Sequence, residues 1–373
     1  MKKDIVRKER LSWDFVIQWT QSKNQDFEKD ERGWRKGKTR THTDDEKQLI
    51  KNTREELERS DDKLYIGPKA ILKYLLENNN QDKQNKNTDS TKINLSFIKS
   101  VLKEFGLSKP HQKRKRGLSK YQNYPKQLIS EIGSLILEID FIQRFIKGQT
   151  KPVHFIAFSC KSLSLKQYRR ISAQTNENVK EELKWFFDNF FIPDAVKMDN
   201  GLAFIGSNSA KKTISKTIKF LFDKKIIPIF TNPRSPWNNG SVEGSNSVFA
   251  RNFWNKFVFK SLADLDKKLE LFNKSSLWYS DYDQNKIQKK ENKEFIPQIY
   301  FIRKIYENQK SGKGEINILN ERINLPNEYI NLYTLSKWNL KTETLYVYFE
   351  KEQEKILIKK LRFEINKNCE INF

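Results

Sequence analysis

Cysteine and histidine are scarce in this chain of 373 residues. It contains two cysteines, Cys160 and Cys369, and three histidines, His42, His111 and His154. None of them shows the paired spacing of a structural zinc site, so a zinc-binding domain is excluded. Two distant thiols provide no disulfide framework either, and we expect both to be reduced.

Long apolar runs are also absent. No stretch approaches the roughly 20 residues that a membrane-spanning helix needs. The first residues, Met1-Lys-Lys-Asp, are not followed by the apolar region of a signal peptide. The sequence therefore predicts a soluble cytoplasmic protein without a membrane partner.

Basic residues outnumber acidic ones. The chain has 71 Lys and Arg against 47 Asp and Glu, which gives a net charge of +24. Such an excess favours a polyanionic partner such as nucleic acid. Lys, Asn and Ile are abundant together, as expected from an AT-rich genome, so composition accounts for part of this charge. The placement of the basic residues is therefore more informative than their number.

The N-terminal region, residues 1–120, reads as helical and basic. A helix is expected over 44–58, with acidic residues in its first turn, where they favour the helix dipole. A second helix is expected to begin at Pro68, a residue suited to the first helical position. A third runs from about Leu95 and ends before Gly106.

Two lysines of that third helix, Lys99 and Lys103, lie off its apolar stripe and are free to face outward. A second short helix with exposed lysines is typical of a helix-turn-helix, here about 66–107, which would enter the major groove of DNA. A plain helical bundle is the alternative. The polar connection between the two helices is longer than the usual tight turn.

A basic segment without acidic residues follows at 109–126. It includes Arg114, Lys115 and Arg116, and its prolines and glycine disfavour a helix. Such a linker is suited to following a phosphate backbone. The alternative is a solvated charged tether that does not become ordered on DNA.

The pattern becomes α/β after residue 128. Helices are expected over 176–191 and near 209–223. The apolar, β-branched runs predict five strands, at 135–142, 152–160, 165–172, 194–198 and 227–231.

Three carboxylates fall on separate elements of this region. Asp140 lies in the first strand, and Asp199 ends the fourth strand before Asn200-Gly201. Glu243 follows a Pro-rich loop at the start of a helix. Taken singly, Asp140 could be a charge on an edge strand, Asp199 part of a turn, and Glu243 part of an ordinary loop. Together, with no His or Cys cluster nearby, they suit hard cations that prefer oxygen ligands.

The helix that carries Glu243 also places Asn246 on the same side, with Arg251 a turn further on. That face could hold a metal ion and contact DNA at once. For Arg251 the alternative is an intrahelical ion pair or simple exposure to solvent. Glu138, two residues before Asp140, belongs to no motif and is interpreted as structural.

The C-terminal region, residues 295–373, follows a polar stretch at 281–294 and reads as all β. Alternating apolar residues predict five short strands, which indicate a small SH3-like barrel. The apolar residues that define these strands are Ile316, Ile318, Ile323, Leu325, Leu345, Val347, Phe349, Ile356, Ile358, Leu361, Phe363 and Ile365.

The order strand-Asp, strand-Asp-Asn-Gly, loop-helix-Glu resembles the Asp, Asp, Glu (DDE) core of insertion-sequence transposases, which is similar to that of retroviral integrases. The resemblance implies a ribonuclease-H-like core over 121–280, with Asp140, Asp199 and Glu243 as ligands of two Mg²⁺ or Mn²⁺ ions. The loop residues Pro236, Asn239 and Gly240 match the family's loop before the Glu. The interval between the second Asp and the Glu is longer than usual for the family.

We therefore expect a multidomain α+β protein: a helical helix-turn-helix region, a ribonuclease-H-like α/β catalytic core and a small C-terminal SH3-like barrel. The resemblance implies a bacterial DDE transposase that binds double-stranded DNA at element ends and target, as a homo-oligomer associated with the nucleoid. The alternatives are the integrase of a retroelement and a domesticated DNA-binding protein without catalysis. The residues expected to contact DNA are Lys99, Lys103, Arg114, Lys115, Arg116, Asn246 and Arg251.

Overall fold

In a computed structural model, the chain forms two compact units, Met1–Leu49 and Ile50–Phe373. In the first unit, Thr43 and Glu46 cap the start of α3 (Asp44–Arg59). The amide of Glu46 donates to Thr43 Oγ1 at 3.3 Å, and the amide of Thr43 donates to Glu46 Oε2 at 3.1 Å. The structure describes residues 42–60, 63–81, 93–108, 124–206, 210–233, 235, 240–280, 282–284, 287 and 294–366.

The second unit begins within α3, and two further helices follow, α4 (Pro68–Gln81) and α5 (Leu95–Glu104). Asn94 caps α5 by accepting a hydrogen bond from the amide of Phe97 at 3.0 Å. The chain leaves α5 at Gly106, whose φ of +67° is the left-handed conformation that glycine adopts without strain. Both expected helices are present, whereas a DNA-binding helix-turn-helix remains a prediction.

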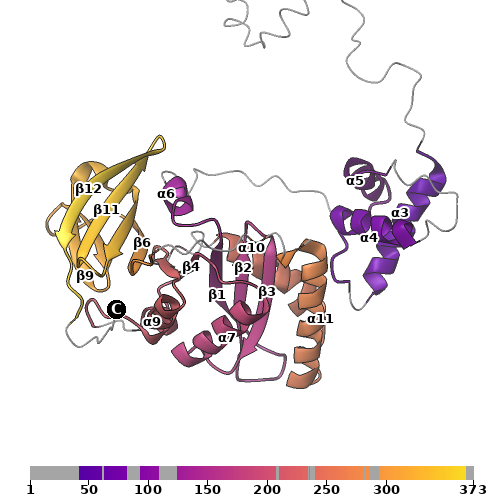
Figure 1. Cartoon of the computed structure of the whole chain (residues 1–373). Helices are drawn as coiled ribbons and strands as arrows, with labels where there is room; N and C mark the ends of the chain where they lie inside the picture. The colour runs from indigo at the N-terminus through magenta and orange to yellow at the C-terminus, as the bar shows by residue number, and fades with distance from the viewer. Residues whose placement is uncertain are drawn as a thin grey trace, which may run out of the picture. The chain divides into compact units, whose positions relative to one another are not determined.

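A nine-stranded sheet is the centre of the second unit, in the order β12-β11-β10-β6-β5-β4-β1-β2-β3 (Figure 1). In this sheet β2 pairs antiparallel with both β1 and β3. β4 pairs parallel with β1, and β5 pairs parallel with β4. The five strands expected for the core are all present, as β1 (Ile136–Arg144), β2 (Val153–Cys160), β3 (Leu165–Ile171), β4 (Ala195–Met198) and β5 (Ile227–Phe230).

Helices cover both faces of this sheet. The alternation of β1 sends Leu137 and Ile139 into one apolar core, which also contains the buried residues of α7 (Asn176–Asn189) and α9 (Lys216–Asp223). Ile142 enters a second apolar core, which contains buried residues of α10 (Gly240–Phe249) and α11 (Leu262–Ser280). Since Asp140 and Ile142 share a phase along β1, Asp140 lies on the α10 side. Three further short elements are α6 (Lys126–Ser130), α8 (Leu202–Ile205) and the π-helical η4 (Ala250–Trp254).

The C-terminal strands extend the central sheet. β6 (Gln298–Lys304) runs parallel to β5, pairing Ile229 with Tyr300 and Phe230 with Phe301. β10 (Tyr333–Asn339), β11 (Thr344–Lys351) and β12 (Glu354–Arg362) then follow in antiparallel order. A separate three-stranded sheet consists of β7 (Tyr306–Glu307), β8 (Gly314–Ile318) and β9 (Glu321–Leu325), and a 3₁₀ turn, η6, spans Asn327–Tyr329.

An SH3-like barrel is not confirmed. The two strands expected around 356–358 and 361–365 are not separate: one strand, β12, spans Glu354–Arg362, and a register shift opposite Val347 and Tyr348 changes its phase between Ile358 and Leu361. β6 and β10 were not expected at all. In the part of the chain that the structure describes, no helix is long and apolar enough to cross a membrane.

Candidate carboxylate site

Asp140 is the most buried of the three expected carboxylates. Its Oδ2 accepts a hydrogen bond from Asn246 Nδ2 of α10 at 2.9 Å, and its Oδ1 accepts one from the amide of Phe141 at 2.9 Å. Burial raises the pKa of Asp140 to about 6, and the negative charges of Asp199 and Glu243 contribute to the increase. β1 and β4 run parallel with Glu138 opposite Lys197, so Asp140 and Asp199 lie two residues further along neighbouring strands.

Asp199 follows β4 directly, at the carboxyl end of the strand. Its Oδ1 accepts a hydrogen bond from the amide of Gly201 at 2.8 Å. A Cβ atom on Gly201 would lie 3.0 Å from that same oxygen, so any larger residue would press on the carboxylate. Burial raises the pKa of Asp199 above its ordinary value, and the hydrogen bond from Gly201 limits the increase.

Glu243 lies in the first turn of α10, where the helix dipole favours a negative charge. Burial raises the pKa of Glu243, and the charge of nearby Glu138 adds to this effect. The interval between Asp199 and Glu243 contains α8, which ends at Ile205, and α9, which begins at Lys216. The expected helix near 209–223 is thus α9, and it starts later than the sequence pattern indicated.

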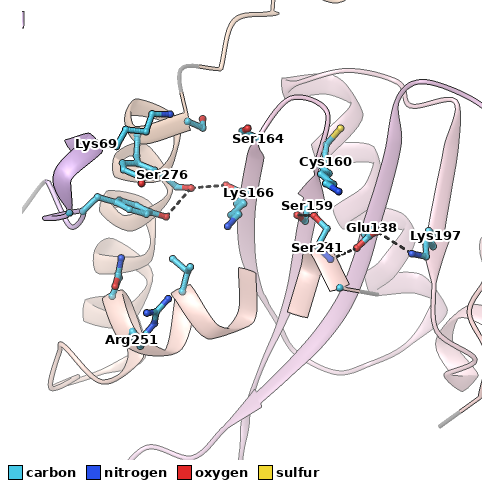
Figure 2. A pocket seen from close by; sticks show the side chains of 18 of the residues that line it. Lys69, Glu138, Ser159, Cys160, Ser164, Lys166, Lys197, Ser241, Arg251 and Ser276 are labelled. Carbon is cyan, nitrogen blue, oxygen red and sulfur yellow. Dashed lines mark hydrogen bonds and ion pairs between the residues drawn. The ribbon is translucent and has the colours of Figure 1, made fainter. Parts of the chain in front are cut away.

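Glu138 determines where α10 begins. Its Oε2 accepts hydrogen bonds from the amides of Ser241 and Val242, at 3.0 and 3.1 Å, so a side chain of β1 satisfies the first donors of the helix. Its Oε1 lies 3.1 Å from Nζ of Lys197 on β4, and both side chains are largely buried. Figure 2 shows Glu138 between Lys197 and Ser241. Glu138 therefore positions the helix that carries Glu243.

Serine side chains fasten α10 to the sheet. Ser159 of β2 shares a 2.8 Å hydrogen bond with Ser241, and Ser245 donates to Ser159 at 3.2 Å. The hydroxyl of Tyr168 on β3 donates to the carbonyl of Ser245 at 2.9 Å. Because these contacts come from two strands, the first turns of α10 are held in a defined orientation against β1.

An unsatisfied oxygen lies beside Asp140. Asn246 uses its Nδ2 on Asp140, while its Oδ1 is buried without a hydrogen-bond partner in the structure. A buried acceptor without a donor is costly unless a ligand or water completes it. Carboxylate and amide oxygens are the ligands that Mg²⁺ and Mn²⁺ prefer, so this set of residues fits a hard divalent cation.

The carboxylates do not enclose an ion-sized space. Among the described residues, no three His, Cys, Asp or Glu side chains are grouped closely enough to hold a metal ion together. A cation would have to draw Asp199 and Glu243 toward Asp140.

The residues expected to contact DNA differ in their exposure and in their hydrogen bonds. Lys99 and Lys103 are exposed on α5. Arg251 lies in η4, and its Nε donates to the carbonyl of Ser247 at 3.3 Å. Asn246 uses its amide on Asp140. The basic-segment residues Arg114, Lys115 and Arg116 and the loop residues Pro236 and Asn239 lie outside the described residues.

Sequence reasoning missed Arg303 of β6. Its guanidinium is buried and donates to Asn200 Oδ1 at 2.9 Å, and to the carbonyls of Thr231 and Asn317, both at 2.7 Å. Asn200 Nδ2 in turn donates to the Thr231 carbonyl at 2.7 Å. Burial lowers the pKa of Arg303 to about 9. A C-terminal strand thus supports Asn200, the residue that follows Asp199. In the sequence, only the arginine that follows the apolar run 299–302 could have indicated this role.

No protein-family model and no curated protein sequence matches this chain. Among solved structures, the chain is similar to retroviral integrases. The catalytic core domain of BIV integrase shares 13% identity, with a TM-score of 0.29 over 44% of this chain and 91% of that one. The simian T-cell lymphotropic virus intasome in complex with PP2A regulatory subunit B56 gamma shares 12%, with a TM-score of 0.34 over 74% and 94%. The HTLV-2 integrase catalytic core domain in complex with magnesium shares 18%, with a TM-score of 0.28 over 36% and 82%.

Two of these structural neighbours are integrase catalytic core domains, and the third is an intasome. The functional conclusion depends on the geometry of the carboxylates themselves.

Proposed function

We propose that the chain is a DDE transposase, a polynucleotidyl transferase that cleaves and joins DNA with Mg²⁺ or Mn²⁺. The observation that carries the proposal is the position of Asp140, a half-buried carboxylate on β1 that accepts a hydrogen bond from Asn246 of α10, the helix that bears Glu243. Asp199 ends β4, which pairs with β1, and Glu243 lies in the first turn of α10, so three elements far apart in the sequence each bring one acid to this part of the sheet. Such convergence has no evident structural purpose, since it lowers the stability of the cation-free fold.

The chain's own residues would hold and orient the reacting groups. Asp140, Asp199 and Glu243 would be the cation ligands, with the buried Oδ1 of Asn246 as a further acceptor. Gly201 keeps Asp199 in place through its amide. When bound, a pair of divalent cations supplies activation of the attacking hydroxyl and neutralisation of the leaving oxygen in phosphoryl transfer.

Two alternatives, a retroelement integrase and a non-catalytic DNA-binding protein, can be distinguished from a transposase. A zinc-binding domain cannot be built from two cysteines and three histidines, which favours a transposase over an integrase that needs such a domain. A non-catalytic DNA-binding protein would gain nothing from keeping three mutually repelling acids. We further propose that the protein acts as a multimer on DNA, because two element ends must reach one target.

Cleavage assays on supercoiled plasmid DNA test the assignment. Asp199→Asn should lower Mg²⁺- or Mn²⁺-dependent nicking by at least about 100-fold, because lost cation binding removes most of the phosphoryl-transfer catalysis. Glu243→Gln should behave in the same way. DNA binding in EDTA should be unchanged for both variants, and Asp188→Asn, an exposed acid of α7, should nick like the wild type. Normal nicking by Asp199→Asn would overturn the proposal.

A further inference from the structure

A cavity of about 1020 Å³ lies beside α10, and the carboxylates of Asp140, Asp199 and Glu243 do not line it (Figure 2). It is bordered by β2, β3, η4, α11 and the chain before α4. Its size is at the upper end of the range for ligand sites. Six basic side chains line it: Lys69, Lys126, Lys161, Lys166, Lys197 and Arg251.

One acidic residue, Glu138, is found among the described lining residues, and it is already paired with Lys197 at 3.1 Å. Among the described lining residues, no carboxylate is paired with Lys161, Lys166 or Arg251. Lys166 shows this most clearly, since no acidic partner is found for it in the described part of the chain. Arg251 donates there only to the carbonyl of Ser247. The wall of the cavity thus carries an uncompensated positive charge.

Two of these cations, Lys166 and Arg251, line the cavity from different elements. Burial lowers the pKa of Lys166, and the positive charge of Arg251 lowers it further. Lys166 projects from β3 and is half-buried, and Arg251 projects from η4 and is exposed. An anion bound between two like charges relieves their repulsion. Lys161, exposed at the end of β2, adds a third cation on the same wall.

The cavity and the carboxylates lie on different sides of α10. Ser241 and Val248, seven positions apart and therefore on one side of the helix, line the cavity. Asn246 faces the other way and donates to Asp140. One side of α10 therefore faces the basic cavity, and the other side faces Asp140.

We propose that this cavity binds the phosphodiester backbone of a DNA strand, on the side of α10 away from Asp140. The inference builds on the proposed function, because it identifies where the substrate is held. A single small anion would neutralise only part of the charge on a wall with several separate cations. A strand carries one phosphate per nucleotide and can meet Lys161, Lys166 and Arg251 in turn.

Binding of a fluorescein-labelled DNA duplex to the full-length protein tests this, by anisotropy in EDTA over a range of salt concentrations. Lys166→Gln combined with Arg251→Gln should weaken binding about tenfold and flatten the slope of log K against log salt by about two units. The matched control is Lys180→Gln with Lys184→Gln on α7, which removes equal charge from the helix on the opposite face of the sheet. That control should change the slope by less than half a unit.

Two further variants keep the test decisive if the double substitution harms folding. Lys161→Gln alters one exposed lysine, and it should flatten the salt slope by about one unit. Lys166→Arg with Arg251→Lys preserves both charges and should bind as the wild type does. The proposal is overturned if the two charge-removing variants, Lys161→Gln and Lys166→Gln with Arg251→Gln, show the same affinity and salt slope as the Lys180 and Lys184 control.

The outcome is separable from that of the proposed function, because binding in EDTA needs no carboxylate. Normal DNA binding by the cavity variants together with inactive Asp199→Asn would refute the cavity and leave the enzyme. Weakened binding by the cavity variants together with active Asp199→Asn would support the cavity and refute the enzyme.

Discussion

Replacing Asp140 with asparagine should stabilise the cation-free protein at neutral pH while removing its proposed activity. The pKa of the folded carboxyl is about 6, against an ordinary value of 3.8. Below about pH 4 the group is protonated in both the folded and the unfolded chain, and its ionisation then costs no stability. As the pH rises through 6, the folded protein must ionise a buried group beside other acids, and stability is lost.

The size of the effect follows from the shift. Two pKa units correspond to about 3 kcal/mol once the group is fully ionised. Screening by solvent reduces the expected gain of Asp140→Asn to about 1–2 kcal/mol. An asparagine can keep a hydrogen bond with Asn246, because the unpartnered Oδ1 of Asn246 can accept from it after an amide flip.

Thermal unfolding in EDTA at pH 7.5 and pH 4.5 measures the difference. The midpoint of Asp140→Asn should exceed that of the wild type by a few degrees at pH 7.5, and the advantage should shrink to about a third at pH 4.5, where the unfolded carboxyl is mostly ionised and the folded one is still protonated. Adding Mg²⁺ should stabilise the wild type and leave the variant unchanged. Asp188→Asn, with the same charge change on exposed α7, should have no effect. A lower midpoint for Asp140→Asn at pH 7.5 would refute the reasoning.

Three other substitutions have defined outcomes. Glu138→Gln should lower the free energy of unfolding by about 3 kcal/mol in urea titrations, because it leaves a buried lysine unpaired. Arg303→Gln should reduce nicking more than DNA binding, because Asn200 loses its guanidinium donor, and equal losses would contradict this. Lys99→Ala with Lys103→Ala should flatten the salt dependence of binding to element ends by about one to two units, and an unchanged slope would show that α5 does not meet DNA.

Much of the core could be predicted because its elements carry clear periodicity. The apolar runs of β1 to β5 and the stripes of α7 and α11 are readable from sequence alone. β6 was missed since Arg303 interrupts its apolar run and a buried arginine is unusual. β10 was missed because Thr334 and Ser336 are buried together with Tyr333 and Leu335, so no alternation marks the strand.

The candidate site was only partly readable. Asp140, Asp199 and Glu243 were singled out from their order and flanking residues, and their role as ligands remains a prediction. The support of the site comes from long-range contacts that no local pattern reveals. Glu138 reaches the start of α10, and Arg303 reaches Asn200 from the C-terminal part of the chain.

Cation binding tests the central claim most directly. Titration of the full-length protein with Mn²⁺, followed by electron paramagnetic resonance of the free ion, requires no knowledge of the DNA sequence that the protein recognises. The wild type and Asp188→Asn should bind Mn²⁺ equally, whereas Asp199→Asn and Glu243→Gln should each lose at least about tenfold in affinity, because each loses a charged oxygen ligand. If both latter variants bind Mn²⁺ as the wild type does, the three carboxylates do not form a metal site.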